Sequence, residues 1–482
     1  MDDRGGVEAV LLTAEIRESL AEFPLLRTLT RDNLDDGLSR CRLLSVPGAM
    51  RIVQEGDYDD TFYVIVKGRC DVNIEKATKH GTVAGLLRDK ESTNKKSRTS
   101  QTLGSLKPGD FFGELSCMSP WPRTGTVFTT GTTVVLEVSQ AVFDDWMDDS
   151  DGFREIMEAA YMQRGVITLL RNIDAFALLP EAALRSLIEG ATNETFKKGA
   201  AIVQQGDTGD ALFVIRGGVV AITVKVKDEE KTVSYMRAGS YFGEMALLDG
   251  TERNATVTAN TKTEVIRIDR DKFMDLVDSS PQAADRLRKT VAERLNAGEK
   301  VLGDESMSEA LSFMAGQGIL EGADVLVVDL SKCIFCGNCE EACDATHDVS
   351  LISLHGPSHK AFLFPTACRN CDDPKCLLKC PVDSISRDVN GEVRIQDHCI
   401  GCAGCAINCP YDTISMRPVG EEVAARAKEA AGIKKPVTQQ AIKCDLCETI
   451  PSGPQCVRSC PTAAISRLGP RQLVRQVLKG GK

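Results

Sequence analysis

Sixteen cysteines crowded into the last third of this 482-residue chain constrain its fold more than any other feature. The chain has nineteen cysteines in all, and the first 330 residues contain only Cys41, Cys70 and Cys117. The N-terminus opens with acidic residues and lacks the basic-then-apolar pattern of a secretory signal, so we expect a cytoplasmic chain with reduced thiols. Clustered cysteines in that setting indicate metal ligands rather than disulfides.

The spacing of these cysteines is typical of ferredoxins. Groups one and three read C-x₂-C-x₂-C-x₃-C, and groups two and four lengthen one internal gap. Three closely spaced thiolates can hold one iron–sulfur cube, while the fourth cysteine reaches a neighbouring one. Structural zinc usually takes two separated C-x₂-C pairs and leaves this spacing unexplained. The four groups are Cys333, Cys336, Cys339, Cys343; Cys368, Cys371, Cys376, Cys380; Cys399, Cys402, Cys405, Cys409; and Cys444, Cys447, Cys456, Cys460.

The segments PTACRNCDDPKCLLKCP, HCIGCAGCAINCPYDTI and KCDLCETIPSGPQCVRSCPTAAI resemble the four-cluster subunits of the dimethyl sulfoxide reductase and formate dehydrogenase families. The resemblance covers about residues 325–468, with Asp344 where proline follows the last cysteine of the other groups. It implies four [4Fe–4S] clusters in two pseudo-symmetric dicluster units, in which groups one and four, and groups two and three, exchange their last cysteines. The implied sets are Cys333, Cys336, Cys339 with Cys460; Cys444, Cys447, Cys456 with Cys343; Cys368, Cys371, Cys376 with Cys409; and Cys399, Cys402, Cys405 with Cys380.

The first 300 residues contain an internal repeat. QEGD at 54–57 recurs as QQGD at 204–207, and FGEL at 112–115 recurs as FGEM at 242–245. The two offsets differ because the first copy has an extra polar segment, which predicts a flexible loop over residues 76–105. Short β-type runs between Gly-Asp and Gly-Gly turns predict a small antiparallel barrel or jelly roll in each copy. Helical apolar spacing predicts flanking helices over 154–170, 180–189 and 282–295.

One segment of each copy suits a sugar ring fused to a phosphate. In the second copy, a helical turn opening after Gly243 would point free N–H groups at an anion. Arg253 would donate to phosphate oxygens, and Glu244 would accept from a sugar hydroxyl. The small Ala255 would let the backbone approach closely. The first copy keeps this pattern but departs from it at residues 116–117 and at Gly125.

These segments resemble the phosphate-binding cassette of cyclic-nucleotide-binding domains, as in the kinase regulatory subunits and the bacterial cyclic AMP receptor proteins. The resemblance implies that Glu244 holds the ribose 2′-hydroxyl and Arg253 the cyclic phosphate of cyclic AMP or cyclic GMP. By analogy Thr124 favours cyclic GMP at the first site, whereas Asn254 leaves the second open. The implied binding residues are Gly113, Glu114, Leu115, Arg123, Thr124, Gly125, Gly243, Glu244, Met245, Arg253, Asn254 and Ala255.

We therefore expect a multidomain α+β chain. Its predicted parts are two jelly-roll nucleotide-binding domains over 1–165 and 166–298, a linker over 299–323, a polyferredoxin domain over 324–470 with a helical insertion at 421–440, and a basic tail over 471–482. The net charge of −11 arises in the first 320 residues, which argues against non-specific binding of nucleic acid. No apolar run approaches 18 residues, so we expect no membrane insertion.

The chemistry predicted for the chain is electron transfer. No catalytic triad, paired catalytic carboxylates, flavin fingerprint or nicotinamide fingerprint stands out, so electrons must enter and leave through other proteins. We expect an electron-transfer subunit of an oxidoreductase, controlled by a cyclic nucleotide, with a catalytic subunit and an electron donor or acceptor as partners. Two alternatives stay open: clusters that sense redox state or oxygen and alter nucleotide binding, and empty nucleotide folds that serve as docking scaffolds. The oligomeric state is open too, and His347 and His398 are expected to be surface or packing residues.

Overall fold

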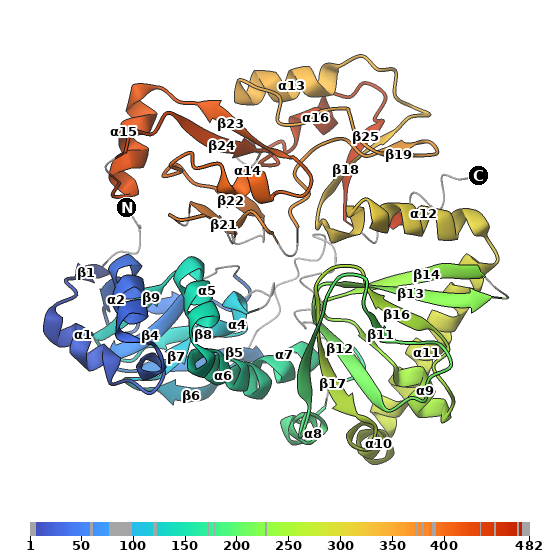
Figure 1. The fold of residues 1–482 in the computed structure, drawn as a ribbon, viewed down its shortest axis with the longest axis horizontal. Coiled ribbons are helices and arrows are strands. Elements are labelled where there is room, and N and C mark those ends of the chain that lie inside the picture. Colours follow the sequence, from blue (N-terminus) through green and yellow to red (C-terminus); the bar gives the residue numbers. More distant parts are fainter. Residues whose placement is uncertain are drawn as a thin grey trace. The chain divides into compact units, whose positions relative to one another are not determined.

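The structure, a computed structural model, describes residues 6–57, 61–76, 99–118, 123–171, 173–177, 179–226, 229–371, 374–377, 380–382, 384–387, 392–433, 435–447, 450–469 and 472–474 (Figure 1). It divides into two compact units. The first comprises 1–191, 271–286 and 387–392, and the second comprises 192–270, 287–386 and 393–482.

Two antiparallel sheets form the centre of the first unit. One has the order β1-β2-β9-β4-β7 and the other the order β3-β8-β5-β6. Strand β4 is buried along almost its whole length because its FYVIV run lies between the two halves of the core. The strands are β1 (Glu8–Val10), β2 (Arg42–Val46), β3 (Arg51–Val53), β4 (Phe62–Lys67), β5 (Cys70–Lys76), β6 (Thr99–Leu106), β7 (Phe111–Phe112), β8 (Thr126–Thr129) and β9 (Thr133–Val138).

Helices pack against this first pair of sheets through an aromatic core. Phe62, Phe143, Phe153 and Trp146 contact one another edge to face, and all four are almost completely buried. The helices are α1 (Ala14–Ala21), α2 (Arg31–Arg40), α4 (Glu114–Cys117), α5 (Gln140–Asp149), α6 (Asp151–Ala160), a π-helical turn (Tyr161–Gly165), α7 (Val166–Arg171) and α8 (Glu181–Leu187). The predicted helices over 154–170 and 180–189 are confirmed, and the predicted domain boundary at residue 165 lies inside the first of these helical runs.

The second unit begins with the same pair of sheets, with orders β10-β17-β12-β15 and β11-β16-β13-β14. The predicted jelly rolls are thus confirmed in both copies. The strands are β10 (Thr192–Phe196), β11 (Ala201–Val203), β12 (Ala211–Gly217), β13 (Val219–Val226), β14 (Glu229–Arg237), β15 (Tyr241–Phe242), β16 (Thr256–Ala259) and β17 (Thr263–Asp269), with helix α9 (Glu244–Asp249). The next helix, α10 (Arg270–Ser279), belongs to the first unit from Asp271 onward.

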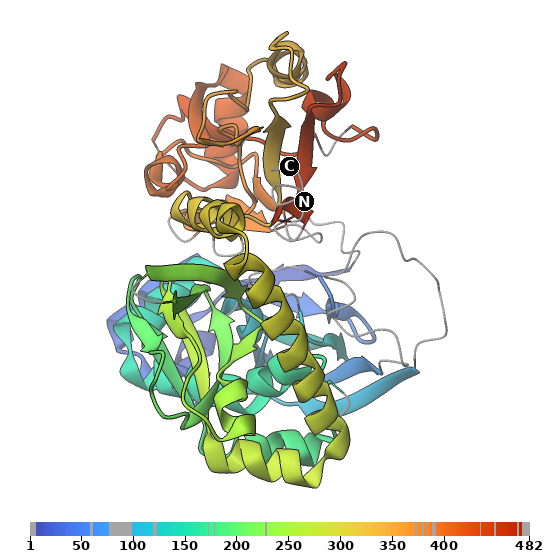
Figure 2. The same cartoon turned by 90° about the vertical axis from the view of Figure 1, so that its right-hand side faces the viewer.

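The predicted linker over 299–323 is wrong, because most of this segment is helical and packed. Helix α11 (Pro281–Leu302) continues to residue 302 and is followed by α12 (Glu305–Gly316), as Figure 2 shows. Apolar side chains of α12, among them Leu311 and Met314, belong to a core shared with the strand that follows. The hydroxyl of Ser308 also donates to the carbonyl of Thr232 in β14 at 3.1 Å. The segment is therefore a structural connection between the second jelly roll and the cysteine-rich part.

The cysteine-rich part is built on a small sheet and two hairpins. The sheet has the order β19-β20-β18-β25, and the hairpins are β21-β22 and β23-β24. The elements are β18 (Val325–Asp329), β19 (Ser358–His359), β20 (Phe362–Leu363), β21 (Ile385–Arg387), β22 (Val393–Ile395), β23 (Ile414–Pro418), β24 (Gln439–Lys443), β25 (Ile465–Leu468), α13 (Asn338–His347), α14 (Gly404–Asn408), α15 (Glu421–Ala430) and α16 (Gln455–Arg458).

Three predicted segments differ from the structure at their ends. The helical insertion over 421–440 is helical only to Ala430, and its last residues begin β24. Of the loop over 76–105, residues 99–105 are part of β6 and pair with β5, while residues 77–98 lie outside the described residues. The tail over 471–482 is described only at 472–474, where Leu473 is fully buried in the core beside α12. Residues 475–482 of this predicted basic tail lie outside the described residues.

Candidate functional site

Each cassette opens with a glycine in the left-handed conformation. Gly113 has a φ of 88° before α4, and Gly243 has a φ of 91° before α9, as the predicted helical turns require. A Cβ at residue 243 would lie 2.6 Å from Arg253 Nη1 and 2.9 Å from the carbonyl oxygen of Ala211. Glycine is therefore needed at this position for its conformation and for its small size.

The cassette arginines hold the backbone around these glycines. Arg253 is 4% exposed, and its guanidinium donates to the carbonyls of Gly243 and Ala211, each at 2.8 Å. Arg123 likewise donates to the carbonyls of Gly113 at 2.8 Å and Thr61 at 2.6 Å. The planar, forked guanidinium of arginine is suited to donating two hydrogen bonds at once. The structure thus assigns both side chains an anchoring role, while phosphate binding stays a prediction.

The repeated Q-x-G-D motif lies against the same arginines. The N–H of Gly56 donates to the carbonyl of Arg123, and the N–H of Arg123 donates to the carbonyl of Asp57. Gly206, Asp207 and Arg253 repeat this exchange in the second copy. Sequence comparison of the two copies revealed the motif, but its role in fixing the backbone of the cassette arginine is visible only in the structure.

The cassette glutamates are buried and paired with an arginine from the helix that follows each jelly roll. Glu114 lies 3.2 Å from Arg164, and Glu244 lies 2.6 Å from Arg294. Burial raises the pKa of both carboxyls, and the paired arginine opposes that shift. Both arginines also cover an aromatic ring, Phe111 in the first copy and Tyr241 in the second. The ribose contact predicted for the glutamates therefore competes with an existing ion pair.

Arg164 and Arg294 were missed by the sequence analysis. They are 130 residues apart, the same offset that separates the two cassettes. That recurrence was the signal that could have identified them. The remaining predicted residues lie beside the cassette helices: Leu115 and Met245 follow the glutamates, Thr124 and Gly125 precede β8, Ala255 precedes β16, and the amide of Asn254 donates to Met245 Sδ at 3.0 Å.

The four cysteine groups share one unusual backbone conformation. In each group the residue before the second cysteine is left-handed: Phe335 at φ 55°, Asn370 at 45°, Gly401 at 70° and Leu446 at 60°. Only one of the four is glycine, so the other three accept the cost of about 1–2 kcal/mol of this conformation. Four unrelated side chains with the same unusual φ indicate that the C-x-x-C loop itself demands the turn.

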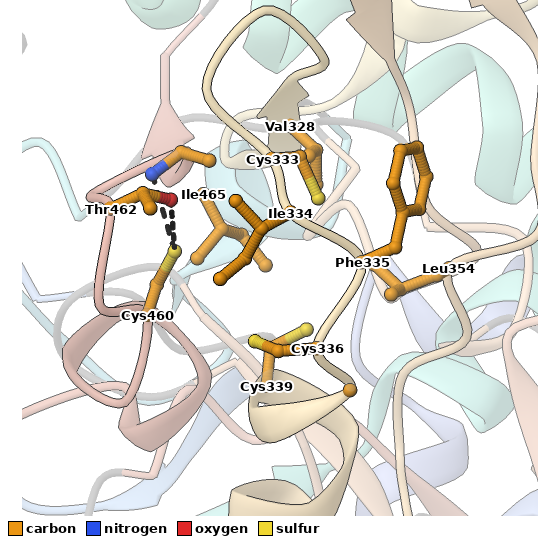
Figure 3. A pocket seen from close by; sticks show the side chains of 12 residues that line it. Val328, Cys333, Ile334, Phe335, Cys336, Cys339, Leu354, Cys460, Thr462 and Ile465 are labelled. Carbon is orange, nitrogen blue, oxygen red and sulfur yellow. Dashed lines mark hydrogen bonds between the residues drawn. The ribbon is translucent and has the colours of Figure 1, made fainter.

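The fold joins cysteines that are distant in the chain. Cys333, Cys336 and Cys339 line one cavity together with Cys460, and Figure 3 shows their sulfurs around it with Ile334 and Ile465. This cavity contains the first set that the family resemblance implies. All nineteen cysteines lie in the described residues, and none of them forms a disulfide.

Electrostatic interactions between thiols join the other three implied sets. Burial raises the pKa of Cys456 to about 12, with contributions from Cys444, Cys343 and Cys447. Burial raises the pKa of Cys405 to about 11, with contributions from Cys399, Cys402 and Cys380. Burial also raises the pKa of Cys371, with contributions from Cys368, Cys376 and Cys409. The exchanged fourth cysteine is thus present in every set.

These thiol sets fit iron–sulfur clusters. Backbone N–H groups donate to the sulfurs of Cys380 from Ser384 at 3.1 Å, of Cys460 from Ala464 at 3.2 Å, and of Cys343 from Leu351 at 3.2 Å. Such N–H···S bonds stabilise thiolate charge and tune cluster potentials. An all-thiolate set is the donor chemistry that a [4Fe–4S] cluster takes. The individual ligand assignments stay predictions.

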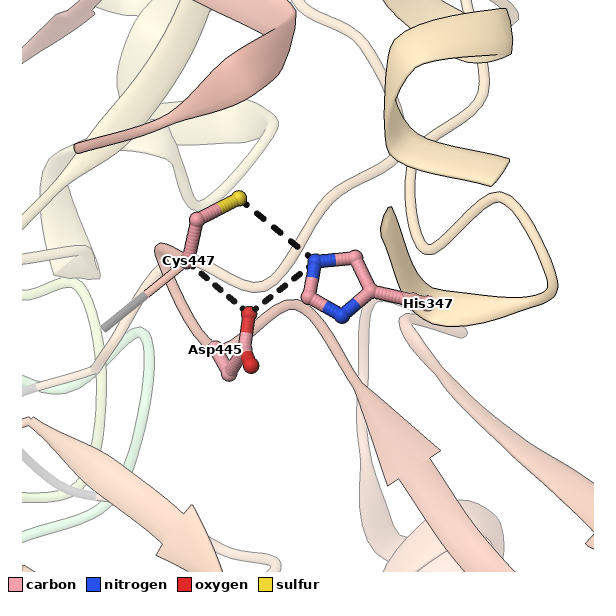
Figure 4. Close-up of side chains that lie close together, drawn as sticks. All are labelled: His347, Asp445 and Cys447. Carbon is pink, nitrogen blue, oxygen red and sulfur yellow. Dashed lines mark hydrogen bonds and ion pairs between the residues drawn. The ribbon is translucent and has the colours of Figure 1, made fainter. Parts of the chain in front are cut away.

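His347 is closer to a ligand cysteine than the sequence suggested. Its Nε2 lies 3.5 Å from Cys447 Sγ and 3.4 Å from Asp445 Oδ1, as Figure 4 shows. The three residues form a compact group of possible metal donors. Because Cys447 already belongs to one of the four thiol sets, the histidine is best explained as a neighbour of that set.

Among the described residues, no helix combines the length and the apolar character that crossing a membrane requires.

Comparison with known proteins identifies two families in one chain. The cyclic nucleotide-binding domain family matches residues 44–150 and 193–280, and the 4Fe-4S binding domain family matches residues 326–345. The chain is 28% identical over 277 residues to the cAMP-dependent protein kinase regulatory subunit of Yarrowia lipolytica, covering 56% of this chain and 64% of that protein. It therefore spans just under two thirds of that relative.

Two bacterial relatives match the cysteine-rich part. Electron transport protein HydN of Escherichia coli K12 is 34% identical over 157 residues, covering 29% of this chain and 85% of that protein. Hydrogenase-4 component A of the same strain is 32% identical over 168 residues, covering 30% of this chain and 82% of that protein. These likenesses confirm the predicted combination of tandem nucleotide-binding domains with an iron–sulfur domain.

Proposed function

The chain belongs to the HydN family of electron-transport proteins through its C-terminal part and carries two cyclic nucleotide-binding domains before it; we propose that cyclic nucleotide binding regulates electron transfer through its clusters. The single observation that supports this proposal best is a continuous line of contacts from the second cassette to a cysteine set. Every step of that line lies within the second unit.

The line begins at the buried Glu244. Arg294, its partner at 2.6 Å, lies on α11, and α11 leads directly into α12. A nucleotide whose ribose hydroxyl bonds Glu244 has to share that carboxylate with Arg294 or displace the arginine. Binding would therefore change the forces on α11, and this differential contact is what a ligand needs to shift an equilibrium.

The line continues through α12 to two cysteine loops. Arg369, between Cys368 and Cys371, donates to the carbonyl of Gln317 at the end of α12 at 2.7 Å. Tyr411, two residues after Cys409, donates to Glu321 at 2.5 Å. The guanidinium of Arg369 also lies 3.9 Å from the centre of the Tyr411 ring. Both cysteine loops of one thiol set are thus hydrogen-bonded to residues that directly follow α12, the helix into which α11 leads.

The sixteen cysteines in their four exchanged sets would hold four [4Fe–4S] clusters. The clusters supply one-electron redox chemistry, and the chain supplies thiolates, N–H···S bonds and burial. We propose as partners a catalytic oxidoreductase subunit and an electron donor or acceptor, in keeping with the names of HydN and of the hydrogenase component. The regulatory ligand would be cyclic AMP or cyclic GMP.

The test uses the full chain purified without oxygen. Iron and sulfide analysis should give about 16 iron atoms per chain for four cubes. Electron transfer from a chemical reductant to an acceptor protein is then measured with and without saturating cyclic AMP or cyclic GMP, while calorimetry reports binding. A rate or acceptor affinity that changes with the nucleotide supports regulation. Saturated binding with unchanged rate and affinity overturns it, and absence of binding favours the scaffold alternative.

A further inference from the structure

One buried arginine lies between two of the thiol sets. Arg467 is on β25, and its side chain is 7% exposed. Its Nη2 donates to Cys444 Sγ at 2.9 Å, and its Nη1 donates to the carbonyl of Cys368 at 2.9 Å and to Asp324 at 3.2 Å. Cys444 and Cys368 belong to different sets, so a single guanidinium contacts the cysteines of two neighbouring sites.

Arg467 also has a donor to spare. Its Nε–H is buried without a hydrogen-bond partner among the described residues. A buried donor without a partner is costly and calls for an acceptor. The thiolate and sulfide sulfurs of a cluster at Cys444 are acceptors of this kind, so the orphaned donor is a second observation that fits a loaded site.

The arginine remains charged in this environment. A guanidinium keeps its proton at every physiological pH, even when it is buried. Asp324, one third exposed, is its one carboxylate partner among the described residues and is partly screened by water. The positive end of the Arg467–Asp324 pair therefore faces the sulfur of Cys444.

The effect of that charge on a cluster follows from simple electrostatics. An oxidised [4Fe–4S]²⁺ cube with four thiolates carries a charge of about −2, and reduction adds one more negative charge. A fixed cation stabilises the more negative state more strongly, and does so most where water is excluded. A nearby buried arginine therefore raises the reduction potential.

We propose that Arg467 is a positioning residue that raises the reduction potential of the cluster held by Cys343, Cys444, Cys447 and Cys456, and more weakly that of the neighbour held by Cys368. This inference rests on the proposed function, because it requires loaded clusters.

A purely structural role is the alternative. Arg467 is paired with Leu326 in the β18–β25 ladder, and its ion pair with Asp324 could simply join the two strands. The chain supplies a matched substitution, because the third cysteine group reads C-P-x-x-x-Ile-Ser-Met where the fourth reads C-P-x-x-x-Ile-Ser-Arg. Arg467→Met thus copies Met416. Asp324→Asn removes the ion pair but keeps the positive charge, which makes it the control.

The experiment is a redox titration of the anaerobically loaded full chain, followed by electron paramagnetic resonance. The signal of the Cys444 site is assigned by its loss in Cys447→Ser. Arg467→Met and Arg467→Gln should shift that midpoint potential to more negative values, with a smaller negative shift at the Cys368 site. Arg467→Lys should restore much of the difference, and Asp324→Asn should leave the potential unchanged or raise it.

Each possible outcome supports or contradicts either the inference or the proposed function. Four loaded clusters with unchanged potentials in both neutral variants overturn the inference and leave the proposed function intact, whereas wild-type protein with fewer than four clusters contradicts the proposed function itself. Equal negative shifts in Asp324→Asn and Arg467→Met would show a structural role. If the neutral variants lose iron while Arg467→Lys loads fully, a positive charge is required at this position and the inference is supported. Loss of iron in the lysine variant as well contradicts it.

Discussion

The two nucleotide cassettes have the same parts but different connections. In both, a left-handed glycine precedes the helix, an arginine binds the backbone, and a buried glutamate pairs with an arginine over an aromatic ring. In the first copy that partner, Arg164, lies in a π-helical turn that leads into α7. In the second, Arg294 lies on α11, which leads into α12 and the cysteine-rich part.

The buried ion pairs of the two cassettes also differ in length and in exposure to water. The Arg164–Glu114 pair is 3.2 Å long with the arginine 42% exposed, and the Arg294–Glu244 pair is 2.6 Å long with the arginine 22% exposed. A shorter, drier pair interacts more strongly. The comparison teaches that equal chemistry in two repeats does not imply equal roles. Among the described residues, it is the stronger pair of the second cassette that lies on a helix leading into α12, and Gln317 and Glu321 after α12 bond two cysteine loops.

The largest expected effect is a loss of nucleotide affinity when the cassette arginine Arg253 is substituted. Arg253→Lys keeps the charge but loses the planar fork that bonds two carbonyls, so nucleotide affinity at the second site should fall by about 100-fold, roughly 2.7 kcal/mol. The response of electron transfer to nucleotide should disappear with it. Calorimetry and the electron-transfer assay measure both quantities.

Arg123→Lys is the matched control for that experiment. It should weaken the first site by a similar factor and leave the electron-transfer response in place. A response that is lost in Arg123→Lys but kept in Arg253→Lys would reverse the assignment of the two cassettes.

A smaller effect is expected on stability. Arg294→Met leaves the buried carboxylate of Glu244 without its ion-pair partner, so the free energy of unfolding should fall by about 1–3 kcal/mol in urea titrations. Arg164→Met should cost less, because its pair is longer and more exposed. Adding Glu244→Gln to Arg294→Met should recover part of the loss. No recovery would show that packing of Arg294 on Tyr241, and not its charge, holds α11.

Coupling between the second nucleotide site and the clusters should weaken when a single hydrogen bond is lost. Tyr411→Phe removes the bond to Glu321, worth about 1 kcal/mol, and should reduce the electron-transfer response while nucleotide affinity stays unchanged. Thr168→Ala is the control, because it also removes a hydroxyl hydrogen bond, here to the backbone carbonyl of Arg164 at 3.1 Å, within the helix that follows the first cassette. Equal effects of the two substitutions would contradict the proposed line of contacts.

The smallest expected effect is a pH dependence in the second cassette. Although partial burial works against it, bonding to Arg267 lowers the pKa of Asp210 below its ordinary 3.8. A lowered folded pKa stabilises the fold above the ordinary value, and this stability is lost as the pH falls through the folded pKa. Asp210→Asn should therefore flatten stability below about pH 4. The change should stay under about 1 kcal/mol, because the carboxylate is 65% exposed.

Much of the fold could be predicted from local patterns. The β-type runs and Gly turns predicted both jelly rolls, and spacing predicted the flanking helices, because strand and helix periods leave direct marks in a sequence. The segment 299–323 was misread as a linker, since its apolar residues have meaning only beside Phe362 and Leu473 of a later part of the chain. The competing ion pairs of Glu114 and Glu244 were missed for the same reason.

The sequence by itself determined the chemistry of this protein: sixteen thiols in ferredoxin spacing, and two copies of a glycine, glutamate and arginine pattern. Spacing within a short loop is a local property, so it can be read from the chain directly. Only the tertiary structure decided that Arg467 contacts both Cys444 and Cys368. It also decided that α12 bonds β14, and that Gln317 and Glu321, which follow α12, bond two cysteine loops. Such contacts join residues up to about a hundred positions apart, and their burial and charge exist only after the chain has folded.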